Sequence, residues 1–290
     1  MTGLAHQIIS GLANGSIYAS VALALVMIYQ STHHVNFAQG EMATLSTYIC
    51  LTLIHAGVPY WGAFAVTVVL SFAMGVLVER ILVRPMADAP ALSAVGVFIG
   101  LLLLINAMDG WIWDYIIKPF PSPFGGSQAV LGGFISPHEL GETAVTLLVL
   151  LIVYVFFRHT SLGLAMRAAA FNPTSSRLCG VRVNRMLALG WGLAAVIGGI
   201  AGMMVAPIVF LDPYMMNGIL IYAFAGALLG GIDNAVGAVI GGFAVGVLEN
   251  LFGAYVVGTE LKLTVALIII VAVLLVKPTG LLGRAVQSRV

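Results

Sequence analysis

The residues best able to do chemistry in this chain do not form any of the common catalytic patterns. His138 and Glu139 begin a His-Glu pair, but Glu142 stands where a zinc-protease helix needs its second histidine. The chain contains no Gly-x-Ser-x-Gly motif and no His/Cys cluster with metal-ligand spacing. Its three lysines are followed by Pro, Leu and Pro, so it has no Gly-Lys-Ser/Thr phosphate-binding loop. We therefore expect no catalysis, metal or cofactor in this chain. If its function needs ATP hydrolysis, the ATPase would be a separate protein.

A second group of polar residues lies inside or beside apolar runs near the N-terminus: Asn14, Ser16, Asn36, Gln39 and Glu41. Polar groups at membrane depth cost several kcal/mol each when they face lipid, so these side chains must face protein or water. One hypothesis is that these side chains line a translocation path through the membrane. The alternative is that their role is structural. In the structural alternative, Asn36 caps a helix, Glu41 lies near the positive helix end, and Asn14 and Ser16 form hydrogen bonds between helices.

The third group is the segment 158–185, which holds five arginines and no acidic residue. Glycine, Asn172 and Pro173 interrupt it, so it is not one continuous apolar span. Short loops rich in Lys and Arg stay in the cytoplasm. The segment is therefore predicted to be a cytoplasmic connection, and Arg284 and Arg289 predict a cytoplasmic C-terminus by the same rule.

The composition of the chain indicates the class of protein that holds these three groups of residues. The chain has 290 residues, of which 61% are hydrophobic and 8% charged, and this is too little polar surface for a water-soluble protein. A net charge of +1 gives no reason to expect nucleic-acid binding. Cys50 and Cys179 are expected at different depths and so without a disulfide. The sequence predicts an all-α, polytopic integral membrane protein.

About eight or nine transmembrane helices are predicted, because a span needs roughly 17 to 25 residues. The runs 36–55 and 218–231 are marginal in length or polarity. Clustered Pro and Gly with mixed charge predict an irregular external loop over 109–142. The glycine-rich region 218–258 predicts two short or broken, closely packed helices. The expected runs are about 6–29, 36–55, 61–82, 91–108, 143–157, 186–210, two within 218–258, and 261–276.

Four motifs, in order along the chain, resemble those of one family. Residues 11–29 begin Gly-Leu-Ala-Asn-Gly-Ser and are followed by Asn36-Phe-Ala-Gln-Gly-Glu41. Then come Glu79-Arg80 with Arg84-Pro85, Gly163 with Arg167-Ala168 and Gly180-Val181, and the glycine-rich block 229–242. Together they resemble the branched-chain amino-acid ABC importer permeases, and the shorter, H-type permease in particular.

The resemblance implies a single transmembrane permease domain over 1–290 in the bacterial inner membrane. It implies three kinds of protein partner: a second permease subunit (identical or homologous), two ATP-binding cassette subunits, and a periplasmic substrate-binding protein. Membrane lipid is the other partner expected. A short helix near 162–171 would dock on an ATPase, with Gly163, Arg167, Ala168 and Gly180 as coupling residues. The arginines of 158–185 would also fix topology, with or without that role. Translocation would proceed by alternating access.

Other functions stay open at this point. Close relatives of the family carry urea or short amides, and the spans do not distinguish these from branched-chain amino acids. A secondary transporter driven by an ion gradient would need paired acids at mid-membrane, for which Glu41, Asp233 and Glu249 are the candidates. The chain also differs from the family pattern at Asn172, near which an acid is usual, and at Ser176, where Ala is usual.

Overall fold

The computed structural model describes residues 2–32, 34–86, 90–125 and 136–283. Within these ranges the chain is helical, and its only β-type pairing is an isolated antiparallel bridge between Lys118 and Leu211. The helices are α1 (Thr2–Thr32), α2 (Gln39–His55), α3 (Tyr60–Val78), α4 (Ala91–Trp113), α5 (Pro137–His159), α6 (Ser161–Phe171), α7 (Pro173–Leu178), α8 (Val183–Val209), α9 (Met216–Gly230), α10 (Ala235–Phe252) and α11 (Lys262–Val276).

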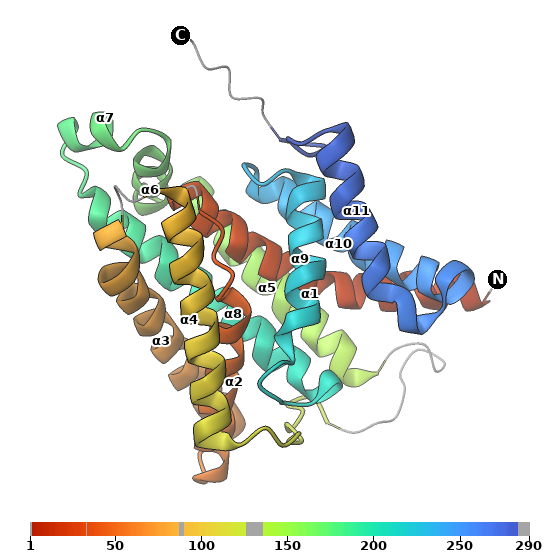
Figure 1. The fold of residues 1–290 in the computed structure, drawn as a ribbon. Helices are drawn as coiled ribbons and strands as arrows, with labels where there is room; N and C mark the ends of the chain where they lie inside the picture. Colours follow the sequence, from red (N-terminus) through yellow and green to blue (C-terminus); the bar gives the residue numbers. More distant parts are fainter. Residues whose placement is uncertain (1, 33, 87–89, 126–135, 284–290) are drawn as a thin grey trace.

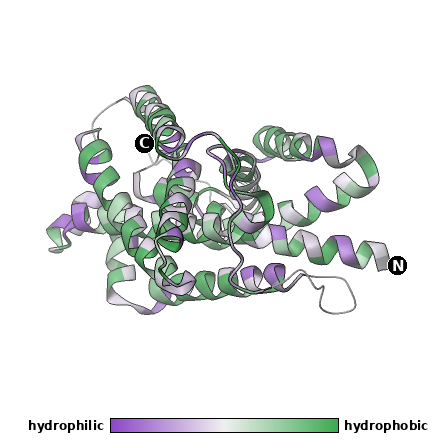
Figure 2. Cartoon of the chain, turned by 90° about the horizontal axis from the view of Figure 1, so that it is seen from below, coloured by the Kyte–Doolittle hydropathy of each residue, from purple (hydrophilic) through white to green (hydrophobic). Residues whose placement is uncertain are grey.

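Six of the described helical stretches are long and apolar enough to cross a membrane. They contain α1, α3, α4, α5, α8 and α10. In Figure 2, hydrophobic residues predominate in the helices taken together, with hydrophilic residues scattered among them. The other three long runs of the sequence form shorter helices: α2 has 17 residues, and α9 and α11 have 15 each. The predicted count of eight or nine full spans is therefore not reached by length and composition.

Helices α1 and α8 form the centre of the molecule, and α3, α4 and α5 lie outside them. Most of the apolar length of α1 and α8 is buried, whereas most of α3, α4 and α5 is accessible. In Figure 1, α1 runs obliquely across the molecule, behind α9. The exposed apolar faces of the outer helices are the surface expected of a protein surrounded by lipid.

Small residues bring α1, α9 and α10 into close contact. A Cβ on Gly15 of α1 would come within 2.9 Å of the Phe243 Cα on α10, and one on Gly226 of α9 would come within 2.7 Å of the Gly242 Cα. These positions form the small-residue faces that membrane helices use to approach one another. The glycine-rich region thus forms two helices, α9 and α10, separated at 231–234 and packed together.

The predicted external loop needs a correction at each end. Helix α4 continues through Asp109 and ends only at Trp113, and α5 begins at Pro137. The connection between the two helices is therefore 114–136 and not 109–142, and its residues 126–135 lie outside the described part. Asp109 and Gly110 resemble a helix end in sequence, but burial against other helices keeps them helical.

Candidate functional site

The predicted coupling segment, residues 158–185, folds into the two short helices α6 and α7 at one end of the molecule (Figure 1). Thr160 begins α6, since its hydroxyl accepts a hydrogen bond from the Gly163 amide at 3.0 Å. Asn172 begins α7 in the same way, because its side-chain oxygen accepts from the Ser175 amide at 2.9 Å. The departure from the family pattern at Asn172 thus supplies a helix cap.

Two predicted coupling residues, Gly163 and Gly180, have clear structural roles. Gly163 is buried where α6 meets α5, and a Cβ there would lie 2.7 Å from the Phe157 Cα and closer still to the Phe156 carbonyl oxygen. Gly180 has a φ of 81° and ends α7. Hydrogen bonds from Gly180 to the Arg177 carbonyl and from Val181 to the Ser176 carbonyl close a Schellman turn there. Both glycines therefore set the shape of the segment.

The surface of this segment carries apolar side chains that sequence reasoning did not select. Phe171 is 93% exposed and Leu178 is 85% exposed, one at the end of each short helix. Exposed large apolar groups next to arginines, outside the long apolar helices, are typical of a protein contact. An amphipathic period would have indicated them, because Gly163, Met166 and Ala169 form the buried face of α6 and leave Phe171 outside.

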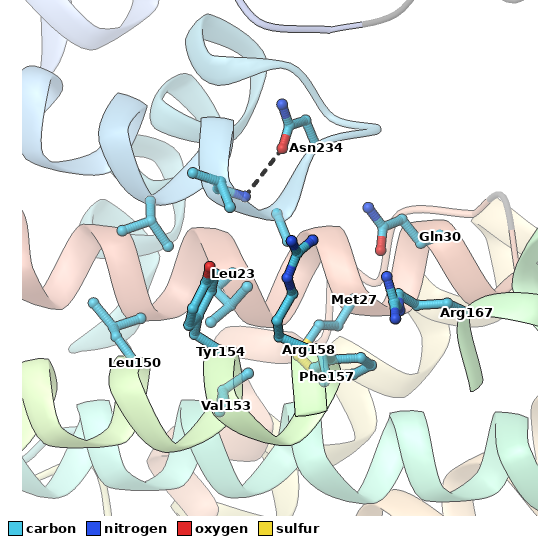
Figure 3. A pocket seen from close by; sticks show the side chains of 13 residues that line it. Leu23, Met27, Gln30, Leu150, Val153, Tyr154, Phe157, Arg158, Arg167 and Asn234 are labelled. Atoms are coloured by element: carbon cyan, nitrogen blue, oxygen red, sulfur yellow. Dashed lines mark hydrogen bonds between the residues drawn. The ribbon is translucent and has the colours of Figure 1, made fainter. Parts of the chain in front are cut away.

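The predicted coupling residues Arg167 and Ala168 have different surroundings from the exposed Phe171. Arg167 lines a groove of about 580 Å³ between α1, α5, α6 and the start of α10, and Ala168 is half-buried. In Figure 3, the side chains of Arg158 and Gln30 project toward this groove and Arg167 lies beside them. Arg167 is thus placed to respond to movement between α6 and the central helix α1, and its role in coupling remains a prediction.

The predicted path residues of α2 are buried in this structure. The side-chain oxygen of Asn36 accepts a hydrogen bond from the Ala38 amide at 3.0 Å, and this bond stabilises the turn before α2. The N-cap of α2 is Ala38 and not Asn36. Gln39 donates to the Ala194 carbonyl of α8 at 3.0 Å. Glu41 accepts from Asn106 of α4 at 3.3 Å. Gln39 and Glu41 therefore tie α2 to α8 and α4, whereas Asn36 bonds locally and lines a hollow of about 220 Å³ between α1, α9 and α11.

Sequence reasoning missed two members of this buried polar cluster, both on α4. Asn106 joins three segments, since its amide donates to Glu41 and, at 2.9 Å, to the Pro213 carbonyl between α8 and α9. Asp109 is 0% exposed, and neither carboxylate oxygen has a hydrogen-bond partner among the described residues. A position one helical turn from Asn106 on the same face of α4 is the only sequence signal that could have indicated Asp109.

Asn14 and Ser16, the two predicted path residues on α1, are half-buried and fully buried, respectively. Ser16 is fully buried, and its hydroxyl donates to the Ala13 carbonyl of its own helix at 2.8 Å. Asn14 is half-buried on α1. Ser16 therefore satisfies its hydroxyl locally, as serine commonly does inside membrane helices, and the path role predicted for both residues stays a prediction.

The arrangement defines a helical membrane protein with an exposed apolar and basic segment at one end and a buried polar cluster between helices. In the described residues, no group of three or more His, Cys, Asp or Glu side chains is placed to hold a metal ion. The geometry suits movement of helices against one another and contact with another protein.

Comparison with known proteins identifies the family. The model of the family described as "Branched-chain amino acid transport system / permease component" matches residues 7–274. The chain is 31% identical over 300 residues to the high-affinity branched-chain amino acid transport system permease protein LivH of Escherichia coli, covering 98% of this chain and 97% of LivH. It is also 31% identical over 308 residues, with the same coverage of each chain, to BraD of Pseudomonas aeruginosa, which has the same description.

A solved structure of PsaBC from Streptococcus pneumoniae in complex with Fab is 15% identical, with a TM-score of 0.48, and covers 94% of this chain and 91% of that one. The sequence matches establish the family by themselves. The chain belongs to the family of branched-chain amino acid transport system permease components, and it is the permease of an ABC-type importer.

Proposed function

We propose that this chain forms, in the bacterial inner membrane, the translocation path of an importer for branched-chain, hydrophobic amino acids. The observation that carries the proposal is the match over nearly the whole chain to LivH and BraD, whose descriptions name that substrate class. A second, homologous or identical permease would complete the path. Two ATPase subunits would bind on the cytoplasmic side, and a periplasmic binding protein would deliver the substrate.

In the proposed mechanism, the ATPases drive alternating access through the coupling segment. Closure of the ATPase pair would push on α6 and α7 through Phe171 and Leu178, the most exposed large apolar side chains of the segment. The movement would reach the membrane helices through Gly163, where α6 contacts the backbone of α5. The buried Gln39 and Glu41 would line the path only after α2 separates from α8 and α4, since they are bonded across those contacts now.

Three of the expected spans are short in this scheme: α2, α9 and α11. A helix of 15 residues rises about 22 Å, less than the roughly 30 Å hydrocarbon thickness. These helices would start or end inside the membrane, where non-helical backbone is tolerated beside a path or within protein. The segment before α2, with its buried Asn36, fits that placement.

Uptake into proteoliposomes tests the function. The chain is reconstituted with its partner permease, ATPases and binding protein, and labelled leucine accumulation is measured with and without ATP. We expect accumulation only with ATP and all subunits, with competition by isoleucine and valine but not by urea or acetamide. Competition by urea or acetamide alone would assign the amide substrates. Uptake by this chain alone on a proton or sodium gradient would overturn the ABC assignment.

A further inference from the structure

A second groove, separate from the one in Figure 3, lies at the same end of the molecule between the end of α3 and the start of α8. Its volume is about 790 Å³. Five arginines from three segments line it: Arg80 and Arg84 after α3, Arg177 on α7, and Arg182 and Arg185 at the start of α8. Figure 1 shows the upper end of α3 beside the start of α8. We call this the arginine groove.

Among the described residues, only one of the five arginines has an acidic partner. Arg84 forms a salt bridge of 2.8 Å with the buried Glu79 and donates to the Asn184 carbonyl at 3.3 Å. Within the described residues, no carboxylate forms an ion pair with the other four, Arg80, Arg177, Arg182 and Arg185, and all four are exposed. Four guanidinium groups around one hollow attract an anion with several oxygens.

The opposite end of the groove is apolar. Phe72 and Val76 of α3 and Leu189 of α8 form its wall. Phe72 precedes Arg80 by eight residues, which is about 12 Å along the helix. The neighbouring outer face of α3 exposes Val69 and Leu77, as expected for a surface in contact with lipid. The groove is therefore cationic at one end and apolar at the other.

We propose that the arginine groove binds an anionic phospholipid of the cytoplasmic leaflet. The phosphate lies among Arg80, Arg182 and Arg185, and one acyl chain runs along Phe72, Val76 and Leu189. Basic pockets between membrane helices on the cytoplasmic side are suited to such headgroups. An acidic protein partner would satisfy the arginines but would leave the apolar wall, 12 Å deeper by the helix rise, without a contact. A phospholipid satisfies both ends at once.

Native mass spectrometry of the full-length protein, purified in a lipid-preserving detergent, tests this directly. The wild type and an Arg80→Gln/Arg182→Gln variant are titrated with dioleoyl phosphatidylglycerol or dioleoyl phosphatidylcholine. We expect the wild type to retain phosphatidylglycerol selectively. The variant should lose affinity by about fivefold for each arginine removed, because each basic residue near the membrane surface contributes about that factor.

Two matched variants separate the site from a general charge effect. Arg158→Gln/Arg167→Gln makes the same charge change at the same end but in the groove of Figure 3, and it should bind phosphatidylglycerol like wild type. Arg80→Lys/Arg182→Lys keeps the charge and should retain most of the selectivity, which also shows that the fold survives changes at these positions. Equal loss in the Arg158/Arg167 variant would overturn the proposal.

Three further results would overturn it. The first is equal retention of the two lipids by wild type. The second is full displacement of phosphatidylglycerol by millimolar inorganic phosphate, which would indicate a free-anion site. The third is unchanged lipid binding in Arg80→Gln/Arg182→Gln together with loss of ATPase capture from the detergent extract, which would make the groove a protein contact.

Discussion

At Gly163, any side chain would have to occupy space that the backbone of α5 already fills. We predict that Gly163→Ala lowers the melting temperature of the purified protein by roughly 5 °C, because overpacking typically costs about 1–3 kcal/mol. Thermal unfolding, monitored through the reactivity of the cysteine thiols, measures this change in melting temperature. Gly100→Ala is the matched control, since no described atom beyond its chain neighbours and its own helix backbone lies within 4 Å of a Cβ there, and alanine favours the helix in both variants. Equal melting temperatures for the two variants would contradict the packing role.

Asn106 offers a second test at the scale of one residue, because its amide bonds both Glu41 and the Pro213 carbonyl. Asn106→Leu should destabilise the protein by about 1–3 kcal/mol, since it leaves two buried acceptors without a donor. Adding Glu41→Leu should restore part of that loss, because one of the orphaned acceptors is then gone. A double-mutant cycle on chemical unfolding gives the coupling, and strictly additive effects would show that Asn106 and Glu41 do not interact.

The buried cluster also shows where sequence reasoning stops. Asn36, Gln39 and Glu41 were selected because polar residues in an apolar run are visible as a pattern. Asp109 was placed in a loop, because an acid followed by glycine and tryptophan resembles a helix end at the membrane surface. Helix α4 packs against α2, which lies more than fifty positions earlier in the chain, and no local pattern encodes that packing or the burial of Asp109.

Among the elements, the paired helices α6 and α7 carry the most specific prediction. Phe171→Ser and Leu178→Ser should each reduce capture of the ATPase subunit by about tenfold, because fully burying such a side chain is worth about 1.5–3 kcal/mol. Pull-down of the ATPase from detergent extracts measures this. Ile116→Ser is the matched control, since Ile116 is exposed on the connection that follows α4, and that connection lies at the opposite end of the molecule from α6 and α7 (Figure 1).

Arg167→Gln tests the other part of the coupling prediction. Its side chain lines the groove between α6 and the central helices, so we expect normal ATPase capture but reduced ATP-dependent uptake. Loss of capture would instead show that Arg167 contacts the ATPase itself. Normal capture and normal uptake would remove Arg167 from the coupling residues.

The helix near 162–171 was predicted almost to the residue because local signals determine it. Thr160 caps its start and Pro173 follows its end, and both effects act within one turn. The bounds of α2, α9 and α11 also came close to the expected runs 36–55, 218–231 and 261–276. Hydropathy did not show whether helices this short cross the membrane, because it measures apolar content and not where backbone can break. Breaks inside the membrane depend on neighbouring helices that satisfy the freed backbone groups.

For the whole molecule, orientation in the membrane is the prediction on which the coupling and lipid proposals both depend. The arginines of 158–185 predict that α6 and α7 lie in the cytoplasm, and the connection 114–136 would then lie outside. The chain carries a natural reporter of this, because Cys179 is exposed between α7 and α8 and Cys50 is buried. A membrane-impermeant maleimide therefore distinguishes the two sides without an added label.

We expect the maleimide to label Cys179 in inside-out vesicles and not in intact spheroplasts. Cys179→Ser should abolish labelling in the vesicles, because Cys50 is closed to the reagent. In the Cys179→Ser background, Tyr115→Cys places an exposed thiol on the predicted external connection, and it should react in spheroplasts. The reverse pattern would place α6, α7 and the arginine groove outside the cell. No cytoplasmic ATPase could then dock on Phe171, and no lipid of the inner leaflet could reach Arg182.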